Sequence, residues 1–226
     1  MSHKLKSLSL ALVAVFALGA VVASSASAGT FTADPSATIT GKQISGTITG
    51  GVKTQHEFTT KAGTIKCSTA TFHGVATAAA TTEQTLTATY SGCFLGGVVP
   101  VHVRMNSCDY LFTAGNTVGG NPDTVEVGAH VKCSNLGDKI EVEATGSTCK
   151  ITIPAQGPLT GIETHNRTDA STNRMDVEAT IDVHSITYEV HGSCPNSPAQ
   201  TVHFNDGTYR GVATLTSDSA GGITVH

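Results

Sequence analysis

TVEVGAHVKCSNLGDKIEVEATGSTCKITIP, residues 124–154, contains three short segments in which apolar and polar side chains alternate. In the first segment, every second position is apolar, and the positions between hold glutamate, glycine, histidine and lysine. The same alternation recurs over 140–144 and 149–153. Because successive side chains of a strand point to opposite faces, each segment predicts a strand with one apolar face. The apolar positions of the first are Val125, Val127, Ala129, Val131 and Cys133.

The rest of the chain repeats this pattern in short runs separated by Gly, Asn, Asp and Pro turns. No window longer than two turns supports an amphipathic helix. The sequence therefore predicts an all-β, antiparallel β-sandwich, held by disulfides, either as one domain over 29–226 or as two packed β subdomains. The segment 155–174 has no strand pattern, and we interpret it as a long loop or as the seam between subdomains.

Four local features refine this prediction. The apolar stripe changes face at Asn106 and Ser107, which indicates a bulge or corner, and again at His184 and Ser185, which indicates a bulge. Asp206-Gly207 lies between strand-like flanks and predicts a hairpin turn. The Thr- and Gly-rich stretch 29–51 predicts a hairpin at the edge of the sheet, where it could pair with another chain.

The first 28 residues have the features of a secretory signal peptide. Lys4 and Lys6 precede an apolar run over 8–23, and Ala26-Ser27-Ala28 has the small-x-small form of a cleavage site. A retained membrane anchor is the alternative, although the apolar run is short for a span. We expect cleavage after Ala28 and a secreted or extracellular chain over 29–226 without a membrane span.

Composition narrows the classes of partner. Cleavage would remove both lysines of the signal and no acidic residue, so the formal net charge would change from −4 to −6. A mildly acidic chain with 13% charged residues lacks the basic surface that nucleic acid or an anionic membrane requires. We expect neither as a partner. The remaining classes are a protein or cell-surface partner and self-association.

The cysteines are even in number and all lie beyond the predicted cleavage site. In an exported chain this predicts three disulfides. Metal ligation is the alternative, but it usually shows close pairs such as Cys-x-x-Cys, and the chain contains none. We favour pairing of Cys67 with Cys93, because they lie on successive predicted strands, and leave the other pairings open. The six cysteines are Cys67, Cys93, Cys108, Cys133, Cys149 and Cys194.

Several short motifs are shared with known sequences. The chain contains AGTIKC, then YSGC, then Cys108-Asp109-Tyr110, a predicted strand ending in VKC, and a late GTYRG. In this combination it resembles a group of uncharacterised, six-cysteine, Thr/Gly-rich exported proteins of actinobacteria. The resemblance implies export and β-structure. It implies no activity and supplies no catalytic or binding residue.

The sequence shows no catalytic motif. There is no HExxH, GxSxG, phosphate-binding loop or Walker pattern, and we predict no cofactor and no catalytic residue. Two carboxylate pairs, Glu141 with Glu143 and Asp176 with Glu178, have the residue types that a glycosidase uses. Because each pair alternates with an apolar stripe, a solvated sheet surface is the favoured interpretation.

Nine histidines lie beyond the signal and are interpreted as scattered surface residues. His102 and His130 could bind a transition metal together if their strands pair, but no His-x-His spacing supports a metal site, and none is predicted. The nine are His56, His73, His102, His130, His165, His184, His191, His203 and His226.

Carbohydrate binding usually relies on exposed aromatic rings, and this chain has no Trp. Tyr90, Tyr110 and Tyr188 are in phase with apolar stripes and are interpreted as core residues. Only Tyr209, beside the predicted hairpin turn, is expected to be exposed.

These observations favour an exported, non-enzymatic structural or interaction module that acts at or outside the cell surface. The alternative is a β-sandwich that binds a small ligand or a glycan through its long loops. The third hypothesis is a hydrolase with an unrecognised site, using His184 or His191 and neighbouring acids.

Overall fold

The computed structural model describes residues 29–48, 51–197 and 201–226; the predicted signal peptide lies outside these ranges. The described residues form strands and connecting turns and contain no helix, which confirms the prediction of an all-β fold. Accordingly, no helix among them could cross a membrane.

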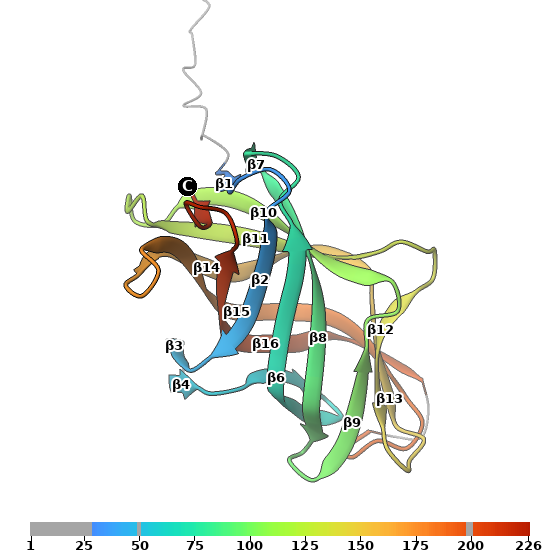
Figure 1. Cartoon of the computed structure of the whole chain (residues 1–226). Helices are drawn as coiled ribbons and strands as arrows, with labels where there is room; N and C mark the ends of the chain where they lie inside the picture. Colours follow the sequence, from blue (N-terminus) through green and yellow to red (C-terminus); the bar gives the residue numbers. More distant parts are fainter. Residues whose placement is uncertain (1–28, 49–50, 198–200) are drawn as a thin grey trace, which may run out of the picture.

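Twelve of the strands belong to one antiparallel sheet, and five short strands form two small sheets (Figure 1). The twelve are β2 (Thr38–Ile44), β5 (His56–Thr60), β6 (Gly63–Val75), β8 (Glu83–Leu95), β9 (Val99–Arg104), β10 (Cys108–Thr117), β11 (Thr124–Cys133), β12 (Lys139–Ala144), β13 (Lys150–Pro154), β14 (Gln156–Asp169), β15 (Arg174–His191) and β16 (Val202–Ser217). The five are β1 (Phe31–Thr32), β7 (Ala80–Thr81), β17 (Thr224–Val225), β3 (Gly46–Ile48) and β4 (Gly51–Lys53).

The large sheet closes on itself in two circuits of hydrogen-bonded strands. The first circuit runs β8-β6-β2-β16-β15-β14-β11-β10 and returns to β8. The second runs β8-β9-β12-β13-β15-β16-β5-β6 and returns to β8. The circuits share β6, β8, β15 and β16, of 13, 13, 18 and 16 residues.

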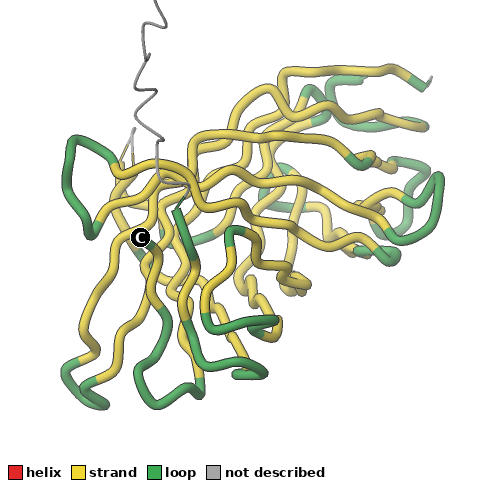
Figure 2. Tube along the Cα trace, turned by 90° about the horizontal axis from the view of Figure 1, so that it is seen from above, coloured by secondary structure: helices red, strands yellow, loops and turns green. Residues whose placement is uncertain are grey.

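The circuits diverge in space but share one core. Figure 2 shows two groups of strands that spread apart from a common region. The inward side chains of both circuits form a single apolar cluster, so opposing faces of the sheet pack as in a sandwich. That cluster is made mainly of Val, Ile, Ala and Leu, with five of the six cysteines and few aromatic rings.

The alternating patterns lie where they were predicted. Val125, Val127, Ala129 and Val131 are buried on β11, whereas Glu126 is exposed. The same alternation buries the apolar residues of β12 and β13. The alternation of apolar and polar residues was therefore sufficient to predict these three strands.

Both predicted changes of face are real. The ladder between β15 and β16 shifts register between Val183 and Ile186, and Ser185 has φ of 60°, so the bulge predicted there is confirmed. Asn106 and Ser107 have φ of 46° and 62° and form the corner between β9 and β10. At that corner the chain leaves the second circuit and enters the first.

The chain forms three disulfides, as the even cysteine count predicts. Cys67 on β6 pairs with Cys93 on β8, the pair that was favoured from the sequence. The other disulfides join Cys108 to Cys133 across β10 and β11, and Cys149 to Cys194 beside β13 and β15. No described cysteine is free.

The prediction of an edge hairpin over 29–51 is wrong for β2. This strand pairs with β16 on one side and with β6 on the other. Within the described ranges, every strand of the large sheet has a neighbour on each side, since both circuits close. A Thr- and Gly-rich composition indicated a strand but carried no information about its neighbours.

The predicted hairpin at Asp206-Gly207 is also wrong, because both residues lie inside β16. Gly207 pairs with Ile186, directly after the bulge of β15. A Cβ atom at this position would lie 2.9 Å from the backbone oxygen of Ile186. Glycine is therefore favoured here, because the two strands approach each other closely. Asp206 accepts a hydrogen bond from the buried Tyr188 hydroxyl (2.9 Å).

The predicted loop over 155–174 is a strand over most of its length. β14 pairs with β11 along one side, and the register of this ladder shifts on both sides of Ala129. Because the pairing is irregular, the apolar and polar residues of β14 do not alternate strictly, and the strand was missed. Its ladder with β15 begins only at Ile162 and Ile181. Before that point the two strands separate, and β15 turns to β13; we call this separation the fork.

Gly161 stands at the fork, with φ of 98°. A Cβ atom there would lie against the backbone oxygen of Asp182. We expect Gly161→Ala to lower the free energy of unfolding by about 2 kcal/mol, measured by urea denaturation. Gly146→Ala is the matched control, since Gly146 also has positive φ but open space around it, and should cost about 1 kcal/mol. Equal losses would show that the contact at the fork carries no strain.

Candidate functional site

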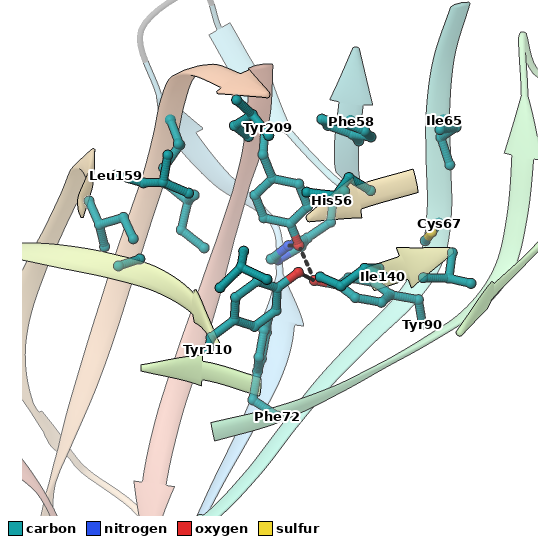
Figure 3. Close-up of a pocket in the computed structure, with 18 of the residues that line it drawn as sticks. His56, Phe58, Ile65, Cys67, Phe72, Tyr90, Tyr110, Ile140, Leu159 and Tyr209 are labelled. Carbon is teal, nitrogen blue, oxygen red and sulfur yellow. Dashed lines mark hydrogen bonds between the residues drawn. The ribbon is translucent and has the colours of Figure 1, made fainter. Parts of the chain in front are cut away.

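A cavity of about 100 Å³ lies where the two circuits meet. Eleven strands of the large sheet, all except β2, contribute to its wall. The wall is apolar apart from four residues: His56, Tyr90, Tyr110 and Tyr209. Figure 3 shows the hydroxyl groups of the three tyrosines pointing toward one another beside the imidazole ring.

The four polar residues form one row of hydrogen bonds. His56 Nδ1 lies 2.6 Å from the Tyr209 hydroxyl, which lies 2.9 Å from that of Tyr90, which in turn lies 3.1 Å from that of Tyr110. At the other end, His56 Nε2 lies 3.2 Å from the backbone oxygen of Val212. The row therefore crosses from β5 through β16 and β8 to β10.

The carbonyl group at one end fixes the direction of every bond in the row. Because an oxygen of a backbone carbonyl can only accept, Nε2 of the neutral imidazole carries the proton and Nδ1 accepts from Tyr209. Tyr209 then accepts from Tyr90, and Tyr90 accepts from Tyr110. The described hydrogen bonds thus use the hydroxyl proton of each tyrosine.

Burial keeps all four groups neutral. Desolvation lowers the pKa of His56 from 6.5 to about 4, against the opposing effect of its bond to Val212. Burial also raises the pKa of Tyr90, Tyr110 and Tyr209 well above the usual 10, and this effect outweighs the lowering by the hydrogen bonds that Tyr90 and Tyr209 accept. At neutral pH the row carries no charge, so it offers neither an acid nor a nucleophile of ordinary strength.

Local sequence makes room for the imidazole. His56 is 1% exposed, and its ring lies 5.5 Å from the Tyr209 ring and 5.8 Å from the Phe72 ring. Gly211 on β16 lies beneath it, where a Cβ atom would come within 2.7 Å of the ring. A larger residue at Gly211 would displace the imidazole from the row.

Sequence reasoning missed two members of this cluster. His56 was interpreted as a surface residue and Tyr209 as an exposed aromatic; both predictions are wrong. Tyr209 was expected to be exposed because it follows the predicted hairpin turn at Asp206-Gly207. That segment is part of β16, and the Tyr209 hydroxyl lies in the interior. His56 alternates in phase with Phe58, and this was the available signal for an inward side chain. Tyr90, Tyr110 and Tyr188 do pack in the core or against it.

The predicted carboxylate pairs lie on the outer surface, bound to basic side chains. Lys150 donates to Glu141 at 2.7 Å, which lowers the pKa of that carboxyl group, and Arg104 binds Glu143. Glu178 is bound by Arg167. Burial raises the pKa of Asp176, but it lines neither the cavity nor the surface hollow described below. The surface interpretation fits these contacts.

The remaining histidines do not gather into a metal site. His102 lies on β9 and His130 on β11, and these strands are not neighbours. No group of three or more potential ligands is found in the described part of the chain. His184 lies 3.0 Å from Asp182, whereas His191 and His203 each lie 3.3 Å from Glu189.

Both histidine pairs contact further side chains, and His191 Nδ1 lies 3.1 Å from the hydroxyl of the exposed Thr201. Asp182 is also bound by Arg210 Nε at 2.7 Å, and Glu189 by Lys139 Nζ at 2.7 Å. Among the described hydrogen bonds, His191 Nε2 meets only the hydroxyl of Thr152, whose side chain is also bonded to Glu189. Both carboxylates are thus held by basic side chains, Arg210 and Lys139.

No known protein family, curated protein or solved structure matches this chain. The geometry of the cavity is therefore the main guide to function.

Proposed function

We propose that this protein is an exported module that binds a small apolar molecule in its interior cavity. The observation that carries the proposal is the chemistry of the wall: sixteen apolar residues, together with four polar ones that bond to one another. A water molecule needs several polar partners, and here those partners are already engaged. An apolar occupant has no hydrogen bonds to lose in such a space, and it gains contact with the wall.

The volume sets the size of the ligand. A dry apolar cavity of about 150 Å³ holds benzene, so a cavity of about 100 Å³ suits a molecule smaller than benzene. Leaving it empty costs about 2 kcal/mol, at roughly 24 cal/mol per Å³. A ligand that restores the missing contacts can recover part of this free energy as affinity.

Two further points bear on the proposal. Export is supported by the predicted signal peptide and by three disulfides, which persist in oxidising compartments. Strand-mediated assembly through β2 has less support, because β2 is paired with β16 on one side and with β6 on the other.

Xenon is the simplest probe of the cavity. Under xenon pressure, methyl NMR signals of Val142, Ile162 and Ile181 on the cavity wall are expected to shift and saturate together. Methyl signals of the exposed Val98 and Leu136 should barely move. Shifts spread evenly over the surface, or none at all, would contradict the proposal.

A filled cavity is the matched variant. Ala129 lines the cavity, and Ala129→Leu places three more carbon atoms in it, so xenon binding should weaken at least tenfold. Leu136→Ala changes an exposed apolar residue instead and should leave xenon binding unchanged. Far-UV circular dichroism and thermal unfolding verify that both variants are folded. Undiminished xenon binding by folded Ala129→Leu would place the xenon site elsewhere.

A further inference from the structure

A second hollow lies on the outer surface at the fork between β14 and β15. It has a volume of about 280 Å³ and mixes polar and apolar atoms. Its wall is formed on one side by β14 and on the other by the bulged part of β15. The lining residues are Pro158, Leu159, Thr160, Gly161, Asp182, His184 and Ser185.

Leu159 lines both this hollow and the interior cavity. Figure 3 shows its side chain at the edge of the cavity. On β15 the two spaces lie on opposite faces of a single strand: Ile181 and Val183 line the cavity, whereas Asp182 and His184 line the hollow. One layer of protein, with Leu159 beside it, therefore separates the two spaces.

That layer is weakly connected at the fork. Between β14 and β15 the backbone ladder starts only at Ile162, so the preceding part of β14 has no ladder bonds to β15. The side chain of Gln156 bridges the gap instead, donating to the backbone oxygen of Thr187 (2.9 Å) and accepting from its N–H (2.8 Å). A side chain can swing away more readily than a paired strand, so the fork is the place where the wall can open.

The polar groups of the hollow suit a head group that donates hydrogen bonds. Asp182 Oδ1 accepts from Arg210 Nε (2.7 Å) and lies 3.0 Å from His184 Nε2. A carboxylate only accepts, and the hydroxyl groups of Thr160 and Ser185 can also accept. Arg210 balances the charge of Asp182, but a carboxylate head group has no proton to donate to it, whereas a hydroxyl or ammonium group has one.

From this arrangement we infer that the cavity and the hollow form one site for a short amphiphile. Its alkyl chain passes Leu159 into the cavity, and its hydroxyl or ammonium head stays in the hollow beside Asp182. The inference rests on the proposed function, because the chain needs the cavity.

The test compares three ligands that share a five-carbon chain: pentan-1-ol, pentylammonium and pentanoate. Calorimetry on the oxidised protein is expected to give at least fivefold tighter binding of the first two than of pentanoate. Asp182→Asn should abolish this preference. Asp176→Asn, which removes the same charge elsewhere on β15, should preserve it.

A chain-length series tests where the tail lies. From propan-1-ol to pentan-1-ol, each added carbon should improve binding by about threefold until the cavity is full. Ala129→Leu should end this improvement at a shorter chain.

The outcomes separate the two proposals. Xenon binding combined with equal affinities for the three head groups would overturn the amphiphile site and leave the cavity function standing. Absence of xenon binding would overturn both. Tighter binding of pentanoate than of pentan-1-ol would also overturn the assignment of the head group.

Discussion

Replacing Cys149 and Cys194 together by alanine is expected to lower the free energy of unfolding by about 4 kcal/mol. This disulfide spans 45 residues, the longest separation of the three, and a crosslink restricts the unfolded chain more when it closes a longer loop. Both sulfur-bearing side chains are buried, so the variant also loses packing. Urea denaturation of the oxidised variant and parent gives the difference directly.

The double variant Cys67→Ala, Cys93→Ala is the matched control. Its sequence separation is 26, so the expected loss is about 3.5 kcal/mol. Each loss is a large fraction of the 5–15 kcal/mol by which domains are usually stable. A loss below about 1 kcal/mol for the Cys149–Cys194 pair would show that this crosslink does not constrain the unfolded chain.

Acidification is expected to destabilise the protein through His56. Its pKa is about 4 in the folded state and 6.5 when unfolded, so the unfolded chain binds the proton more readily between these values. The stability that neutral His56 contributes is present above pH 6.5 and is lost as the pH falls toward 4. The total loss is about 3 kcal/mol, of which about 2 kcal/mol falls between pH 7.5 and 5.

The measurement is a set of urea denaturation curves at several values between pH 7.5 and 5. Carboxyl groups with lowered pKa values, such as Glu57, Glu141 and Glu189, lose their contribution below their ordinary pKa of 4.5, outside this window. His56→Gln is the control: it should be less stable at pH 7.5 and nearly insensitive to pH down to 5. An equally steep dependence in both proteins would assign the effect to another group.

The sequence predicted a strand correctly where burial of one face makes apolar and polar residues alternate along it. Val125 to Val131 alternate strictly because one face of β11 is buried, and the bulge at Ser185 shifted the alternation visibly. The closure of the sheet left no such trace. It depends on pairings such as Tyr110 with Leu86 and Val183 with Tyr209, which join distant segments and need no special local sequence.

Local sequence motifs also gave wrong predictions where contacts between distant strands determine the structure. Asp206-Gly207 is typical of a hairpin turn, yet here glycine lets β16 pass close to the bulged β15. The cavity could not be predicted, because it is a small volume left over among side chains from eleven strands. The hydrogen-bonded row was hidden for the same reason: its four members lie on four strands, in segments far apart in the chain.

The sharing of β6, β8, β15 and β16 by both circuits has a consequence for how the protein comes apart. If one circuit unfolded, four strands of the other circuit would unfold with it, because these strands belong to both. We therefore expect the described strands to unfold in one cooperative transition, despite their two diverging groups. A cut in a shared strand such as β15 would therefore break both circuits at once.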